Sequence, residues 1–274
     1  MIQLVRPALS VNAARSLQQY QTAVDGQPDF PAQVSFAKSD FPAKNVIGNA
    51  TFDEVKLRLL DMSSGAERCH YCEDSKADEV EHLLPKDVYP NHCYNWNNYY
   101  YSCGNCNGPK NNKCAVINAA TNTLIDITPP KKLRNAEPVA PPPPIQGIIA
   151  IIDPIADNPL DYLFLNITEG FTFSEKPDAN TIEFLKAKYT VKILRLNRSF
   201  LLTARAKAYE NFRARLKEYC IDKNKGIAKP QLDAMKAGIK QEAHQTVWQE
   251  MKRQRNFIPE LQVLFDQVPE ALEW

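Results

Sequence analysis

The hydrophobic and polar positions of residues 51–64 repeat with the period of a helix. Val55, Leu59 and Met62 share one face, and Thr51 with Glu54 resembles an N-terminal capping box, so the pattern predicts a helix that buries this face. Residues 1–50 show no such period and carry scattered Pro and Gly. We therefore expect these 50 residues to form an irregular arm that packs on the core.

The second half of the chain begins with a different pattern. The segment 129–144 is rich in proline and includes PPPP at 141–144, which predicts an extended, semi-rigid linker. The continuous apolar run IQGIIAIID (145–153) is typical of a buried strand, and DYLFLNIT with EGFTFSE predicts a hairpin that turns near Gly170. Helices are expected over 179–198 and from Ser199 to Tyr219. One or two more follow, and Pro230 fits the first turn of the next helix.

These elements predict an α+β chain in four parts: an arm (1–50), a core (51–128), the linker (129–144) and a mainly helical C-terminal region (145–274). The chain has 274 residues, 44% of them hydrophobic, which is enough to build a core. Its first residues do not read as a signal peptide, and no run of about 18 apolar residues predicts a membrane span. We expect a cytoplasmic, reducing location, where clustered cysteines favour metal binding over disulfides.

Four of the seven cysteines form two matched pairs. Cys69-His-Tyr-Cys72 and Cys103-Gly-Asn-Cys106 are C-x2-C knuckles, each able to place two thiolates on one tetrahedral ion. Together they predict one structural Zn²⁺ held by four sulfurs. The alternative is four ordinary buried cysteines. The gap of about 30 residues between the knuckles is wider than the commonest ribbon spacing, so it must contain structure of its own.

The remaining cysteines, Cys93, Cys114 and Cys220, have no matched partner and are expected to be core thiols or loop residues. His70 and His92 are possible reserve ligands, although plain surface histidines are the favoured interpretation of both.

The residues between the knuckles have the order of a known nuclease motif. Val80, His82 and Leu84 alternate with their neighbours and predict a short strand, and Asn98 lies five residues before Cys103. The remaining elements are Glu81-His82 followed by Pro85-Lys86, Asn107 directly after Cys106, and Lys110 three residues later. This order resembles the HNH motif, a ββα fold around one catalytic divalent metal ion, with Asn107 at a position where many relatives carry His.

Phosphodiester hydrolysis explains these residue types. A neutral imidazole accepts a proton near pH 7, which makes His82 the candidate general base. Glu81 and Asn107 offer the hard oxygen ligands that suit catalytic Mg²⁺ or Mn²⁺. Adjacent strand residues point to opposite faces, so a local bulge or a strand end is required if Glu81 and His82 are to serve one site.

Other roles come from the resemblance. It implies that Asn98 holds the loop and orients His82, with Asn97 as a nearby competitor for this role. Lys110 is expected to contact phosphate, and Lys86 and Lys113 are further candidate contacts to nucleic acid. The alternatives are purely structural roles. Asn98 would then be a turn residue, Asn107 a helix cap, Lys110 a solvated charge and His82 a core histidine.

The similarity extends beyond the motif. The segments RCHYCE (68–73), EHLLPK (81–86), NWNNYYYSCGNCN (95–107), IIDPIADNPLDYLFLN and LRLNRSFL (194–201) look like the HNH subunits of Septu anti-phage systems, the PtuB family, whose relatives accompany some retrons. This resemblance implies an endonuclease of host defence that cuts DNA or possibly RNA beside an SMC/ABC-type, PtuA-like ATPase. The rival interpretation is a non-catalytic zinc-ribbon module that binds nucleic acid or protein.

The net charge of +1 hides an uneven distribution. Residues 66–113 hold five Lys and Arg against seven Asp and Glu, a net charge of −2. Residues 186–225 hold twelve against three, a net charge of +9, and form the basic footprint of the chain. This segment is either a phosphate-binding surface, or a solvated helix face or interface for an acidic partner.

Overall fold

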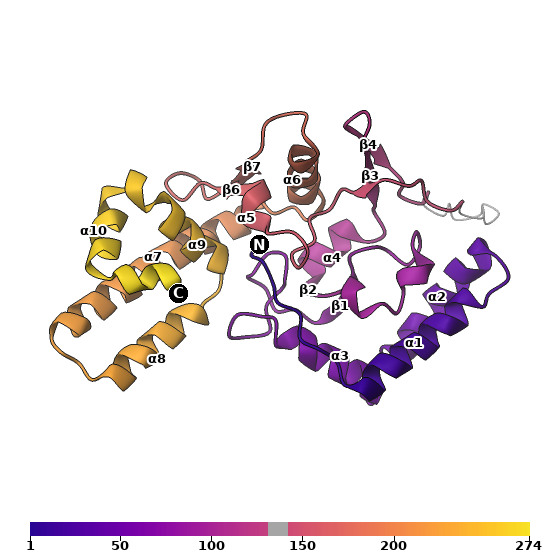
Figure 1. The fold of residues 1–274 in the computed structure, drawn as a ribbon, viewed down its shortest axis with the longest axis horizontal. Coiled ribbons are helices and arrows are strands. Elements are labelled where there is room, and N and C mark those ends of the chain that lie inside the picture. The colour runs from indigo at the N-terminus through magenta and orange to yellow at the C-terminus, as the bar shows by residue number, and fades with distance from the viewer. Residues whose placement is uncertain (131–141) are drawn as a thin grey trace.

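A computed structural model describes residues 1–130 and 142–274 and shows a chain of mixed helix and strand. The proline-rich linker predicted for 129–144 lies largely outside the described residues. Figure 1 shows α1–α3 at one end of the molecule, the C-terminal helices α7–α10 at the other, and β1, β2 and α4 between them. No helix of the described residues is long and apolar enough to cross a membrane.

The first 50 residues are not irregular, because two helices occupy most of them. The helix α1 spans Val11–Asp25 and is capped by the Ser10 side chain, and α2 spans Phe30–Lys44 and is capped by Asp29. Proline misled the prediction: Pro31 stands in the first turn of α2, where a helix tolerates it. The expected packing on the core is confirmed, since Leu17 and Phe41 join the main buried cluster.

The helix predicted over 51–64 is confirmed as α3, Ala50–Leu60, with Val55 and Leu59 fully buried. Its capping box is not. Asn49 caps the helix by accepting from the two amides that follow Ala50, and Glu54 instead accepts from the backbone N and the Oγ of Ser10, at 2.6 and 2.7 Å. Glu54 therefore ties α3 to the start of α1.

The two knuckles flank a small antiparallel sheet. Strand β1, Glu79–His82, pairs with β2, Tyr99–Ser102, in the register Glu79↔Ser102 to His82↔Tyr99, and α4, Gly104–Lys110, follows directly. Two short 3-10 helices, η1 (Pro90–His92) and η2 (Trp96–Asn98), lie in the connection between the strands. The ladder is regular, and His82 is the last residue of β1, so the strand ends at the proposed base.

A second sheet has the order β4-β3-β5, formed by Thr123–Asp126, Ala115–Asn118 and Ile148–Ile149. Strand β5 is much shorter than the 145–153 strand expected. Its continuation is buried, but the amide of Ile152 donates to Thr190 Oγ1 at 2.8 Å instead of to a strand. The hairpin is confirmed as β6, Leu163–Leu165, with β7, Phe173–Glu175, and Gly170 has a positive φ of 68° at its turn.

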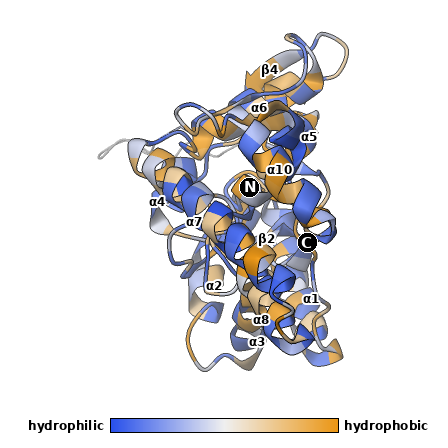
Figure 2. Ribbon diagram, turned by 90° about the vertical axis from the view of Figure 1, so that its left-hand side faces the viewer, coloured by the Kyte–Doolittle hydropathy of each residue, from blue (hydrophilic) through white to orange (hydrophobic). Residues whose placement is uncertain are grey.

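The C-terminal region is helical, as expected. After the short α5, Pro159–Tyr162, come α6, Ile182–Ile193, and the long α7, Ser199–Asn224, which outruns the predicted end at Tyr219. Three more helices follow where one or two were expected, and Pro230 stands in the first turn of the first of them: α8 (Lys229–Lys240), α9 (Gln245–Gln254) and α10 (Pro259–Gln267). Two short 3-10 helices, η3 (Arg255–Phe257) and η4 (Pro269–Glu273), flank α10. Figure 2 shows hydrophilic and hydrophobic residues alternating along α7, whose apolar side joins the main buried cluster.

Candidate metal centre and active site

The four paired cysteines meet in one buried cluster, as the knuckles predict. Their Sγ atoms all lie within 4.8 Å of one another, and the Sγ atoms of Cys72 and Cys103 are 3.8 Å apart. That distance excludes a disulfide, and it matches the edge of about 3.8 Å that a tetrahedron with Zn–S bonds of about 2.3 Å requires. The cluster can therefore hold a structural metal ion such as zinc.

The other cysteines and histidines near this region are placed as follows. Cys93, Cys114 and Cys220 are buried thiols, as expected. His70 is not a surface residue: it is 3% exposed, its Nε2 lies 3.0 Å from the Leu59 carbonyl, and its Nδ1 accepts from the Tyr101 amide. His70 directly follows the knuckle cysteine Cys69, and its side chain turns inward. Both of its ring nitrogens contact backbone groups, so neither is left to bind a metal ion in the cluster. His92 is half-buried.

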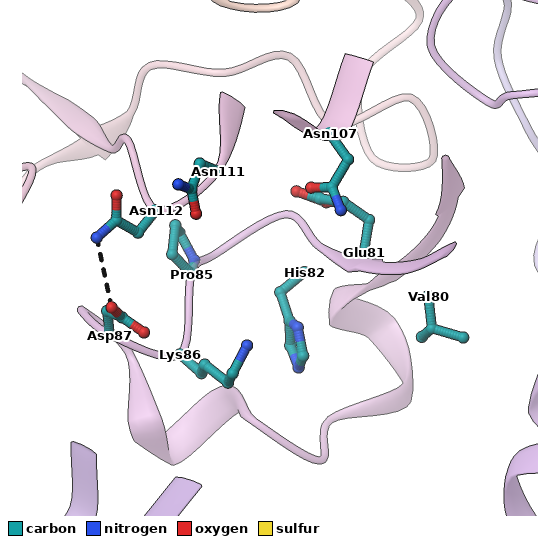
Figure 3. A pocket seen from close by; sticks show the side chains of 9 residues that line it. All are labelled: Val80, Glu81, His82, Pro85, Lys86, Asp87, Asn107, Asn111 and Asn112. Atoms are coloured by element: carbon teal, nitrogen blue, oxygen red, sulfur yellow. Dashed lines mark hydrogen bonds between the residues drawn. The ribbon is translucent and has the colours of Figure 1, made fainter. Parts of the chain in front are cut away.

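A pocket of about 130 Å³ opens beside the end of β1 and the C-terminal half of α4. Figure 3 shows Glu81 directed toward Asn107, whereas the imidazole of His82 points toward Lys86. The strand alternation therefore holds, and both residues reach one pocket because β1 ends at His82. The remaining lining is polar apart from one valine and one proline: Val80, Pro85, Lys86, Asp87, Asn111 and Asn112.

The hydrogen bond of His82 fixes its tautomer. Its Nε2 lies 2.8 Å from the backbone carbonyl of Cys93, which also accepts from the Tyr99 hydroxyl at 2.7 Å. A carbonyl only accepts, so Nε2 carries the proton and Nδ1 keeps its lone pair. Burial lowers the pKa of His82 to about 3, with the Lys86 charge acting in the same direction. The ring is therefore neutral at pH 7 and can accept a proton at Nδ1.

Glu81 forms a buried ion pair with Lys110. The Lys110 Nζ contacts Glu81 Oε1 and donates to the His82 carbonyl at 2.7 Å, and both side chains are at most 2% exposed. Burial raises the pKa of Glu81, and the Lys110 charge opposes that rise. Lys110 is thus a buried counter-charge in this structure, and a contact with phosphate requires the pair to open. Its burial could not be read from its place three residues after Asn107.

Asn107 is oriented by Glu79, a residue that the sequence reasoning did not single out. The Asn107 Nδ2 donates to Glu79 Oε2 at 2.6 Å. Since the amide nitrogen is engaged with β1, the Oδ1 of Asn107 is the atom left for another partner. The signal was present in the sequence: Glu79 and Glu81 are two apart on a strand and therefore share the face that meets α4.

Asn98, rather than Asn97, holds the connection between β1 and β2. Its Oδ1 accepts from the Leu84 amide at 2.7 Å, and its Nδ2 donates to the carbonyls of Leu84 and His92 at 2.9 and 3.0 Å. His92 precedes Cys93, whose carbonyl binds His82. Asn98 is therefore placed to fix the backbone that orients the imidazole, whereas the side chain of Asn97 forms no hydrogen bond with a described residue.

We expect Asn98→Ala to lower the free energy of unfolding by about 2–5 kcal/mol, because three backbone groups lose their partner, and a buried unpaired group costs about 1–3 kcal/mol. The change at Asn97→Ala, one residue away, should stay within about 0.5 kcal/mol. Urea unfolding of both variants measures the difference. Equal losses in the two variants would contradict the assignment.

The basic segment 186–225 is largely engaged within the molecule. Lys186, Arg213, Arg215 and Lys223 form ion pairs with carboxylates of other elements at 2.5 to 2.8 Å, and Arg205 is 2% exposed. The exposed cations that form no ion pair with a described residue are fewer: Lys188, Lys192, Arg195, Lys207 and Lys217. The basic surface that α6 and α7 offer to phosphate or to a partner is therefore smaller than the charge of +9 suggests.

Lys113, which was predicted to contact nucleic acid, is exposed, and its side chain donates to the Pro109 carbonyl.

Comparison with known proteins gives one informative match. No family model matches the chain. The Septu protein PtuB of Bacillus thuringiensis is 44% identical to it over 87 residues, which are 28% of this chain and 33% of that protein. The resemblance to PtuB inferred from the sequence segments is thus confirmed, over about a third of PtuB's own length.

Proposed function

We propose that this protein is a divalent-metal-dependent endonuclease of the HNH type that acts in anti-phage defence. The observation that carries the proposal is the convergence of Glu81, His82 and Asn107 on one polar pocket, with Asn107 directly following Cys106 of the four-cysteine cluster. A zinc ribbon needs its cysteines and has no use for these three side chains. The similarity to PtuB supports the defence role.

The residues of the pocket suit hydrolysis of a phosphodiester. His82 accepts the proton of the attacking water at Nδ1, and its Nε2–H stays on the Cys93 carbonyl, so the ring keeps its orientation during the transfer. Asn98 keeps that carbonyl in place through the neighbouring His92 carbonyl. Lys86 lines the same pocket and offers a positive charge to the phosphate.

The donor set of the pocket fits a hard divalent cation. Glu81 offers a carboxylate from the face of β1 that meets α4, Asn107 on α4 offers an amide oxygen, and such oxygens suit Mg²⁺ or Mn²⁺. When bound, the ion polarises the phosphate and stabilises the leaving alkoxide. Lys110 neutralises Glu81 in the structure, so binding of the cation competes with this ion pair.

The test of the proposal is nicking of supercoiled plasmid DNA, and of a single-stranded RNA in parallel, with Mg²⁺ or Mn²⁺ and with EDTA. We expect cleavage that depends on the divalent ion while the zinc content stays constant. Binding of nucleic acid without cleavage, by folded protein that retains zinc and has its partner present, favours the non-catalytic ribbon module instead.

We further propose that the chain acts with an SMC/ABC-type, PtuA-like ATPase that docks on its C-terminal region. The exposed cations of α6 and α7 and the exposed Phe200, 61% accessible, support a docking surface there. We expect the chain and a PtuA-like ATPase to co-elute in size-exclusion chromatography after co-expression. Separate elution, together with full activity of the isolated chain and normal growth of cells that express it, would exclude this partnership.

A further inference from the structure

The segment LRLNRSFL (194–201) joins α6 to α7, and the proposed cleavage chemistry uses none of its side chains. Leu194, Leu196 and Leu201 are fully buried. Asn197 accepts from the amide of Phe173 and donates to its carbonyl, both at 2.8 Å, and so fastens the segment to the start of β7. The backbone before α7 is therefore held in one place, which fixes where the next side chain points.

That next side chain is Arg198, and it points at the four-cysteine cluster. Its Nη1 lies 3.6 Å from the Sγ of Cys106, and its Nη2 is buried without a hydrogen-bond partner among the described residues. Arg198 is half-buried, and its Nη1 also donates to the carbonyls of Leu194 and Arg195 at 3.4 Å. Those carbonyls are neutral, and a positive charge partly removed from water is costly unless an anion compensates it. Four thiolates on one Zn²⁺ carry a net charge of −2, which is the compensation that this position needs.

The other knuckle holds a second C-terminal helix. Directly after Cys72, the Oε2 of Glu73 accepts from the Thr246 amide at 3.4 Å, and Asp74 Oδ1 lies 3.0 Å from His244 Nε2. These two partners stand at the start of α9, and Arg198 stands at the start of α7. Each knuckle is thus attached to the beginning of one helix of the C-terminal region.

We propose that Arg198 donates a hydrogen bond to the metal-bound thiolate of Cys106, and that this contact couples the docking of α7 to the metal state of the centre. The inference rests on the proposed zinc centre. When the metal leaves, the Sγ of Cys106 is no longer held in place within reach of the Arg198 Nη1, so the first turn of α7 loses this contact and loosens. Outer-sphere partners of this kind typically change metal affinity by about 10- to 100-fold.

The test compares Arg198→Met with Lys207→Met. Lys207 is exposed on the same helix, so the second variant loses the same charge without a contact to the cluster. Zinc transfer to a chromophoric chelator should be about 10-fold faster or more in Arg198→Met and unchanged in Lys207→Met. In the cobalt-substituted protein, the thiolate-to-cobalt charge-transfer band should shift only in Arg198→Met. A purely structural role of Arg198 would lower the melting temperature and leave that band in place.

The possible outcomes distinguish a failure of the proposed metal centre from a failure of the proposed Arg198 contact. Folded wild-type protein that holds no metal would remove the centre itself. Wild-type protein with zinc, and Arg198→Met with an unchanged transfer rate and cobalt band, would overturn the Arg198 contact alone, as would an equal effect of Lys207→Met. If Arg198→Met does not fold, Arg198→Lys decides, because lysine keeps the charge and loses the planar fork. A shifted cobalt band then supports the contact, and an unchanged band overturns it.

Discussion

Cys72→Ser should yield a protein that neither retains zinc nor folds its central core. Hydroxyl oxygen is a poor ligand for zinc, so three thiolates remain where the structural site needs four. Structural zinc contributes about 10–16 kcal/mol in small zinc modules, which is as large as the whole stability of an ordinary domain, about 5–15 kcal/mol. The two knuckles also flank β1 and β2 in the chain, and the second one runs into α4. They hold these elements together, so the pocket should be lost with the metal.

Cys220→Ser is the matched control for this change. Cys220 is also a buried thiol, but its Sγ donates to Gln267 Oε1 at 2.8 Å, and a serine hydroxyl can make the same bond. Metal analysis and thermal unfolding by circular dichroism should show about one zinc per chain and a near wild-type transition for Cys220→Ser only. A Cys72→Ser protein that melts like the wild type would show that the cluster is not a structural metal site.

The knuckle spacing and the strand alternation could be read from the sequence because both are local signals. Two C-x2-C pairs specify four thiolates on one ion wherever the intervening chain runs, and the cluster is found as expected. The alternation of residues Glu79 to Leu84 predicted a short strand, and β1 covers the first four of them, Glu79–His82. The same alternation placed Glu81 and His82 on opposite sides, and the strand end that the prediction required is found at His82.

Contacts between residues far apart in the chain could not be predicted from such local signals. Lys110 appeared as a solvent-exposed or phosphate-binding charge, because the seven residues of α4 are too few to show a periodicity from which to infer burial. Its burial depends on Glu81, which is 29 residues earlier in the chain and stands on the facing strand. Arg198 was counted only as one cation of a basic segment, whereas its side chain points at Cys106, 92 residues away. The two helices in residues 1–50 were missed because Pro and Gly were taken as breakers, although Pro31 starts a helix.

The proposed role of Asn107 also depends partly on a local signal in the sequence and partly on a long-range contact that the sequence does not reveal. Its place directly after the second knuckle predicted that a helix opens at Asn107, whereas α4 begins three residues earlier, at Gly104, and Asn107 lies within it. The orientation of its amide depends on Glu79, and only the structure brings that carboxylate within 2.6 Å. A sequence motif can therefore name the residue types of a site, while the atoms that face the substrate are set by partners outside the motif.

Substitution of the proposed base should produce the largest change in activity. We expect His82→Ala to reduce the cleavage rate by roughly 100- to 10,000-fold, because a general base contributes about that much to such reactions. Zinc content should be unchanged, since the four-cysteine cluster does not include His82. Its neutral ring packs against Phe41, with centroids 4.4 Å apart, so some stability is lost with the cavity that forms.

The measurement is single-turnover cleavage of plasmid DNA with saturating Mn²⁺ and the proposed ATPase partner present, at a temperature where circular dichroism shows the variant folded. His92→Ala is the control, because it removes a half-buried histidine of the same connection that does not line the pocket. It should cleave at a rate close to that of the wild type. If folded, zinc-loaded His82→Ala cleaves as fast as His92→Ala, the proton leaves through another group, and the fixed tautomer of His82 serves only the packing around Cys93.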